Sequence, residues 1–93
     1  MSPLKRTWAL VRDVMRPGAL DEMTKEMIYA AVSMTNNCDY CIHSHTAGAR
    51  GKGMTTAMFN ELMAVVALAN ETNTISNGYR IDVDEHLRDP LAR

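Results

Sequence analysis

Two cysteines separated by two residues stand near the middle of the sequence, at Cys38 and Cys41. On the first turn of a helix, positions i and i+3 face the same side, so their sulfurs can form or break a disulfide with modest adjustment. Unpaired N–H groups and the positive end of the helix dipole at such a terminus stabilise thiolate over thiol. The pair is therefore predicted to be a redox-active dithiol.

A histidine follows one helical turn later, because His45 lies four residues after Cys41. At that spacing the imidazole can accept the thiol proton or stabilise the thiolate, as a base does for a nucleophile. Such a base needs an orienting partner, and Glu26 is the candidate. In an antiparallel helical hairpin turning at Asn37, Glu26 lies about 16 Å before the corner and His45 about 12 Å after it. A proton relay from Glu26 through His45 to Cys41 is therefore predicted.

Helical periodicity accounts for most of the chain around this dithiol. Apolar residues recur at steps of three and four, and only a short alternation from Tyr79 to Val83 is typical of a strand, so the predicted fold class is all-α. Glycines at positions 48, 51 and 53 are expected to end the third helix. The four expected helices run from an N-cap at Ser2 to Pro17-Gly18, from about Glu22 (N-cap Asp21) to Asn36, from about Cys38 to Ala49, and from Thr55 or Thr56 to a stop at Gly78.

The middle of the fourth expected helix, residues 62–69, is apolar on every side. A helix of this kind is normally buried, and a chain of 93 residues has little of its own surface to cover it. A homo-oligomer is therefore predicted. Residues 1–93 are expected to form one domain with a charged C-terminal tail from about residue 79, and Tyr29 is expected in the core.

Composition excludes several classes of protein. Ten Lys plus Arg against eleven Asp plus Glu give a net charge of −1, without the basic surplus that binds phosphates, so no nucleic-acid partner is expected. The longest purely apolar stretch is far shorter than the roughly 20 residues that span a bilayer, and the amino terminus lacks an apolar signal core. Two cysteines cannot build the framework of a secreted mini-protein. We therefore expect a soluble, cytoplasmic protein without membrane association.

The pattern E-x11-C-x2-C-x3-H, from Glu26 to His45, resembles the active-site signature of the alkylhydroperoxidase D-like family within the carboxymuconolactone decarboxylase superfamily. The flanks also match, at Leu20–Ile28 and at the Asn-Asn-Cys-x-Tyr-Cys corner, and the resemblance covers about residues 18–80. The resemblance implies an all-helical fold of about four helices, assembly into trimers or hexamers, and thiol-dependent reduction of alkyl hydroperoxides.

In the catalytic cycle that this resemblance implies, Cys41 is the peroxidatic thiolate, activated by His45 and Glu26, and it passes through a sulfenic acid. Cys38 is then the resolving thiol, and the product is a Cys38–Cys41 disulfide. No metal and no bound cofactor are expected. The resemblance implies that an external dithiol, carried by a lipoyl-bearing or thioredoxin-like partner protein, reduces the disulfide.

The sequence departs from the best-studied members of that family in two respects. Those proteins have two related helical units per chain and this one has a single unit, so its site is expected to depend on contacts between subunits. They also often carry a histidine where this sequence has Tyr40, which makes Tyr40 a secondary candidate for the substrate site or proton relay. The namesake decarboxylases generally do not use this dithiol, which disfavours a carboxymuconolactone decarboxylase activity.

Two non-catalytic functions remain open on the same residues. One is an oligomeric redox sensor whose disulfide alters assembly. The other is a scaffold clipped by zinc at the two cysteines and His45, with His43 as a nearby donor. Because His43 lies about 200° round the helix from His45, it cannot face the same metal unless that helix breaks, so His43 is expected at the surface or in a subunit contact.

Overall fold

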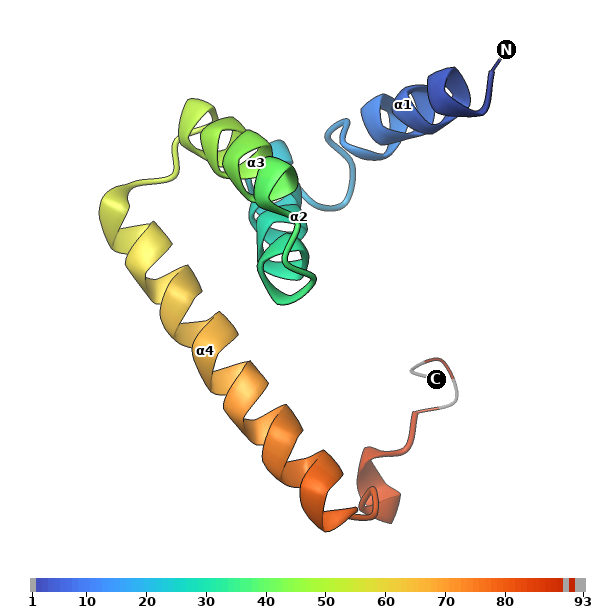
Figure 1. Cartoon of the computed structure of the whole chain (residues 1–93), viewed down its shortest axis with the longest axis vertical. Coiled ribbons are helices and arrows are strands. Elements are labelled where there is room, and N and C mark those ends of the chain that lie inside the picture. The colour runs from blue at the N-terminus through green and yellow to red at the C-terminus, as the bar shows by residue number, and fades with distance from the viewer. Residues whose placement is uncertain (1, 90, 92–93) are drawn as a thin grey trace.

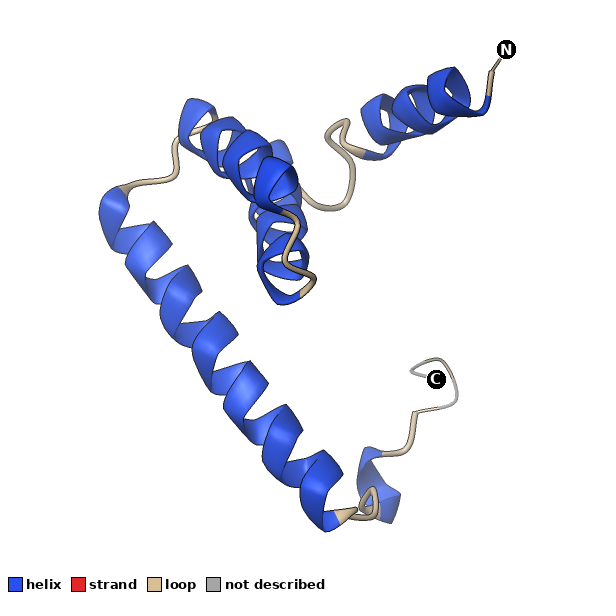
Figure 2. Ribbon diagram, viewed as in Figure 1, coloured by secondary structure: helices blue, strands red, loops and turns tan. Residues whose placement is uncertain are grey.

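A computed structural model describes residues 2–89 and 91, and every regular element in those ranges is helical. The predicted all-α class with four main helices is confirmed (Figure 2). The expected domain and its tail also take in residues 1, 90, 92 and 93, which lie outside the described residues. The elements are α1 (Pro3–Val14), α2 (Glu22–Thr35), α3 (Asp39–Gly51), α4 (Thr56–Tyr79) and a 3-10 turn, η1 (Glu85–Leu87).

Three helices begin where their capping residues predicted. The Ser2 hydroxyl accepts a hydrogen bond from a backbone N–H of the first turn of α1. Asp21 accepts one from the backbone N–H of Thr24 at 2.7 Å, and this bond holds the pKa of Asp21 below its usual value. Thr55 caps α4 in the same way. Each cap satisfies a backbone donor that has no partner within its own helix.

The first helix ends earlier than predicted, at Val14 rather than at Pro17-Gly18. The residue before a proline is biased away from the helical conformation, so Pro17 disfavours helix at Arg16 as well as at its own position. The chain between Met15 and Asp21 is consequently a linker between α1 and α2.

Two helices run further than their glycines predicted. Helix α3 continues past the expected end at Ala49 to Gly51, and the first positive φ after this helix, 110°, is at Gly53. Helix α4 continues through Gly78, and the left-handed residue that caps it is Arg80, with a φ of 52°. A single glycine weakens a helix interior without breaking it, because the backbone hydrogen bonds on either side are kept.

Helices α2 and α3 form the packed part of the chain, and α4 also packs on α2. Figure 1 shows α3 lying against α2, with α1 and the long α4 extending away from this pair. Two small residues, Ala30 of α2 and Ala49 of α3, are almost completely buried. Small side chains such as these let the backbones of α2 and α3 approach closely.

The corner between α2 and α3 reverses the chain in three residues. Asn37 takes the left-handed conformation, with a φ of 57°, which asparagine tolerates better than most residues. The backbone N–H of Cys38 then donates to the carbonyl of Ser33 at 3.0 Å. This is a Schellman-type end to α2, and it places the first cysteine beside the last turn of that helix.

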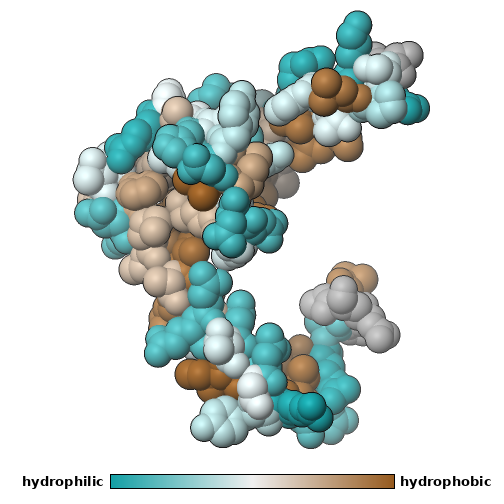
Figure 3. Space-filling view, in the orientation of Figure 1, coloured by the Kyte–Doolittle hydropathy of each residue, from teal (hydrophilic) through white to brown (hydrophobic). Residues whose placement is uncertain are grey.

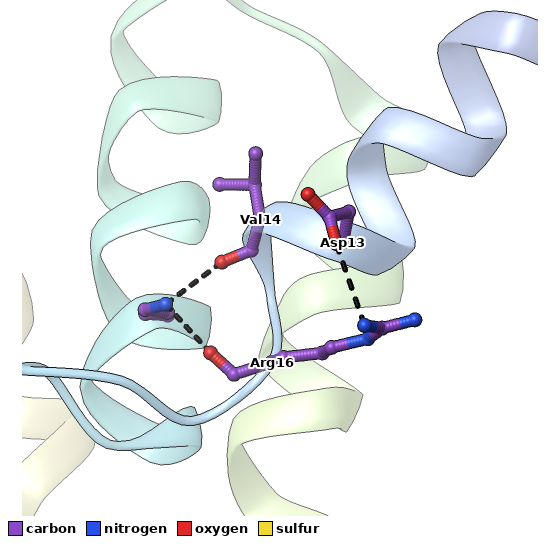
Figure 4. Close-up of polar contacts among 4 residues, drawn as sticks. Asp13, Val14 and Arg16 are labelled. Atoms are coloured by element: carbon purple, nitrogen blue, oxygen red, sulfur yellow. Dashed lines mark hydrogen bonds and ion pairs between the residues drawn. The ribbon is translucent and has the colours of Figure 1, made fainter.

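A lysine fastens the linker after α1 to α2. The Lys25 ammonium donates to the carbonyl oxygens of Val14 at 2.8 Å and Arg16 at 2.6 Å (Figure 4). The Arg16 guanidinium turns to Asp13, 3.5 Å away. The two hydrogen bonds from Lys25 therefore hold the linker beside α2. Helix α1 itself packs against none of the other described helices.

Large apolar side chains remain exposed over much of this single chain. None of those described is fully buried, and in the apolar middle of α4 Val65 is 66% exposed and Leu68 60%. Figure 3 shows apolar surface on both α1 and α4. The predicted burial of α4 is thus not achieved within the chain. Among the described residues, no helix combines the length and the apolar character needed to cross a bilayer.

Replacing Lys25 by methionine keeps the aliphatic stem and removes the two hydrogen bonds to the linker. We expect amide hydrogen exchange in residues 15–20 to accelerate about tenfold, because a hydrogen bond to a charged group is worth roughly that factor or more. The matched control is Lys5→Met on α1. Equal exchange in both variants would contradict the fastening role.

Candidate active site

The centre of the site is a direct contact between α2 and α3. Nδ1 of His45 lies 2.6 Å from Oε2 of Glu26, with the two side chains only 12% and 17% exposed. A carboxylate can only accept, so Nδ1–H is the donor, and Nε2 of a neutral imidazole is left to take a proton. Helix geometry predicted that Glu26 and His45 approach each other, and the two side chains are bonded directly, without a bridging water.

An aromatic ring holds the imidazole from one face. The rings of Tyr29 and His45 are stacked, with centroids 3.6 Å apart and planes 22° from parallel. Tyr29 comes from α2, three residues after Glu26, so one face of α2 supplies both contacts to the histidine. The hydrogen bond and the stacking together restrict the rotation of the His45 side chain.

The two cysteines lie at the start of α3, both as free thiols and both half-buried. Cys38 is the N-cap residue and Cys41 follows in the first turn. A hydrogen bond with Cys38 raises the pKa of Cys41, burial and the Cys38 charge raise it further, and the Ser33 hydroxyl lowers it. The helix terminus predicted a stabilised thiolate, whereas the pKa of Cys41 is raised, and the hydrogen bond with Cys38 is the largest cause. In such a pair of thiols, one negative charge also disfavours a second beside it.

Ser33 is a site residue that the sequence did not reveal. It is only 5% exposed, its hydroxyl donates to the carbonyl of Tyr29 at 2.8 Å, and its interaction with Cys41 favours the thiolate. Ser33 and Tyr29 lie seven and three residues after Glu26, which are positions on one helical face. This spacing is the signal in the sequence that could have placed Ser33 at the site. It also explains why Tyr29 lies on the same face of α2 as Glu26 and contacts His45.

A cavity of about 550 Å³ opens beside the dithiol. Both cysteines and Ser33 line it, together with apolar side chains of α2 and of the linker, including Leu20 and Ile28. Lys25 also borders the cavity, but its ammonium is already engaged by two backbone carbonyls. The space next to the sulfurs is therefore suited to an uncharged, apolar group.

The remaining sequence candidates lie apart from this contact. Tyr40 is 75% exposed and is not among the residues that line the cavity. The side chain of His43 is 79% exposed and bonds to its own helix at the Asp39 carbonyl, so its expected surface position is confirmed. Within the described ranges, no three His, Cys, Asp or Glu side chains are grouped so that they could share a metal ion.

The helical hairpin and its half-buried dithiol, histidine and glutamate define a class of small all-α dithiol proteins. The chain belongs to the carboxymuconolactone decarboxylase family, whose model matches residues 3–83. The solved structure of the alkylhydroperoxidase AhpD core from Rhodospirillum rubrum superimposes with a TM-score of 0.86 at 55% sequence identity, over 92% of this chain and 65% of that one. This likeness confirms the alkylhydroperoxidase D-like resemblance.

A curated relative comes from Paracoccus denitrificans, where it is described as uncharacterized protein 4 in the cox locus. It is 41% identical over 59 residues, which make up 63% of this chain and 53% of that protein. The chain thus spans between half and two thirds of the length of these two relatives.

Cys38 raises the pKa of Cys41 and Ser33 lowers it, so removing each side chain should shift this pKa in opposite directions. Cys38→Ala removes the hydrogen bond and the charge that raise the pKa, so the midpoint for alkylation of Cys41 moves to lower pH. Adding Ser33→Ala removes the group that lowers the pKa, so the midpoint moves back to higher pH. Alkylation rates of Cys41 measured against pH by mass spectrometry test both signs. A Ser33→Ala midpoint that moves to lower pH would contradict the assignment.

Proposed function

We propose that this protein is a dithiol peroxidase that reduces alkyl hydroperoxides. The observation that carries the proposal is the 2.6 Å contact between Glu26 and His45, one helical turn from Cys41. The apolar cavity beside the dithiol offers room for the alkyl group of a substrate. The likeness to a structure described as an alkylhydroperoxidase core adds support.

The first step is deprotonation of Cys41. Its pKa is raised by Cys38, so the thiol needs a base close by, and in the proposal Nε2 of His45 takes the proton. The Glu26 carboxylate stabilises the imidazolium that forms. The thiolate attacks the terminal oxygen of the hydroperoxide, the O–O bond breaks, and the alkoxide leaves with the proton from His45. The products are Cys41 sulfenic acid and an alcohol.

The second step closes the disulfide. Cys38 attacks the sulfenic sulfur of Cys41, the S–O bond breaks, and the oxygen leaves as water with the thiol proton. The pair is then two electrons more oxidised than at the start. An external dithiol protein, of the lipoyl-bearing or thioredoxin-like kind, returns both electrons by thiol–disulfide exchange. No bound cofactor takes part in the proposed cycle, and a cytoplasmic location would supply such reductants.

The proposal includes a homo-oligomer, a trimer or hexamer. The support lies in the exposed apolar residues of α1 and α4, which one chain leaves uncovered. Leu4 on α1 and Val65 on α4 are each about two thirds exposed, at 67% and 66%. Burying such side chains against further copies would supply the apolar core that the single chain lacks.

Steady-state turnover tests the proposed enzyme. We expect the protein to consume many equivalents of cumene hydroperoxide when dihydrolipoamide is present, since the dithiol is regenerated in each cycle. Cys41→Ser should abolish this turnover, and Cys38→Ser should stop it at a sulfenic acid or a mixed disulfide. Tyr40→Phe is the control, and it should keep most of the activity because Tyr40 lies outside the cavity lining.

Other outcomes would point to the other functions of these residues. Retained turnover in Cys41→Ser would contradict the assigned peroxidatic thiolate. Oxidation of the dithiol by one equivalent of hydroperoxide without further turnover would identify a redox sensor. Thiols that stay blocked until a chelator is added would identify a zinc-clipped scaffold.

A further inference from the structure

Gly48 of α3 faces the carboxylate of Glu26 across the contact between α2 and α3. A Cβ built on Gly48 would lie 2.7 Å from Cδ and Oε2 of Glu26, and 3.0 Å from Oε1. Carbon atoms do not approach a carboxylate so closely, because the van der Waals contact is well above 3 Å. The carboxylate therefore occupies the space that any other side chain at position 48 would fill.

This space lies one helical turn from the histidine. Gly48 follows His45 by three residues, so the two positions share a face of α3. One turn of α3 supplies the nitrogen that binds Glu26, and the next supplies the space that holds its carboxylate. Glycine is unfavourable inside a helix, so this position weakens α3 locally while it admits the carboxylate.

We propose that Gly48 is a positioning residue that holds the Glu26 carboxylate against Nδ1 of His45. The proposal of a proton relay rests on the proposed function, whereas the positioning itself concerns the structure alone. A methyl group at position 48 displaces the carboxylate, which is the far end of a flexible side chain and can rotate away. The helices therefore stay packed, and the 2.6 Å hydrogen bond to His45 is lost.

The residues around Glu26 and His45 determine where a displaced carboxylate would lie. Tyr29 of α2 covers one face of His45, and Cys41 lies one turn before it on α3. Lys52, at the end of α3, binds Glu22 at 2.7 Å, and its pKa is raised first by Glu22 and further by the charge of Glu26. Within the described residues, α4 adds no ion pair to this group. Lys52 is thus the cation toward which the carboxylate would turn.

The chain contains a matched control for this position. Gly51 lies on the same helix, three residues further on, and a Cβ there would meet nothing within 4 Å. Both Gly48→Ala and Gly51→Ala replace a helical glycine of α3 by a residue of higher helix propensity. Only the first places a methyl group against Glu26, so any difference between the two variants reports that contact.

The experiment follows the Nδ1 proton of His45 by NMR in full-length protein, together with the alkylation rate of Cys41 against pH in a Cys38→Ala background. We expect the downfield, slowly exchanging Nδ1–H signal in the parent protein and in Gly51→Ala, and its loss in Gly48→Ala with helix content unchanged. The alkylation rate at neutral pH should fall about tenfold in Gly48→Ala alone, because the base loses its orienting partner.

A second comparison separates positioning from folding. In a Glu26→Ala background the carboxylate is gone, so adding Gly48→Ala should change neither the alkylation profile nor the helix content. A further loss in that double variant, or the same loss of signal in Gly51→Ala, would overturn the proposal. So would a Gly48→Ala variant that keeps the Nδ1–H signal. Because the NMR signal does not depend on turnover, a protein without peroxidase activity could still show the predicted loss.

Discussion

The hydrogen bond between Glu26 and His45 is the interaction on which the rest of the site depends. It joins α2 to α3, it fixes which imidazole nitrogen carries the proton, and both partners are largely shielded from water. Shielding strengthens such a bond and makes the loss of either partner costly. Tyr29 stacks on the ring of His45, and the space at Gly48 accommodates the carboxylate of Glu26.

The fold around this bond consists of a closely packed helical hairpin and two further helices with exposed apolar side chains. Ala30 and Ala49 let the helices approach, and the left-handed Asn37 turns the chain so that the dithiol returns to the same face of α2. Beyond this hairpin, α1 and α4 expose apolar side chains and leave the cavity beside the cysteines open. These exposed apolar side chains are the observation on which the proposal of a homo-oligomer rests.

Much of this arrangement could be predicted from the sequence. Periodicity and capping residues located the helices, and spacing alone brought Glu26 to His45, because a helical hairpin fixes distance along its axis. The direction of the Cys41 pKa could not be predicted, since it depends mainly on the hydrogen bond with Cys38 and on burial. The extension of α3 beyond Ala49 to Gly51 was missed, because local propensity treats these glycines as residues that end a helix. Sequence spacing also did not reveal that Gly48 lies against the Glu26 carboxylate across the helix contact.

Replacing Glu26 by glutamine tests the coupling most directly, because the amide keeps the shape of the carboxylate and removes its charge. In a Cys38→Ala background, the alkylation rate of Cys41 is measured against pH, with circular dichroism as the check on folding. A relay through His45 predicts a rate at neutral pH about tenfold lower, with helix content unchanged. Superimposable pH profiles for the two proteins would show that Glu26 does not assist the thiol, and would contradict the relay.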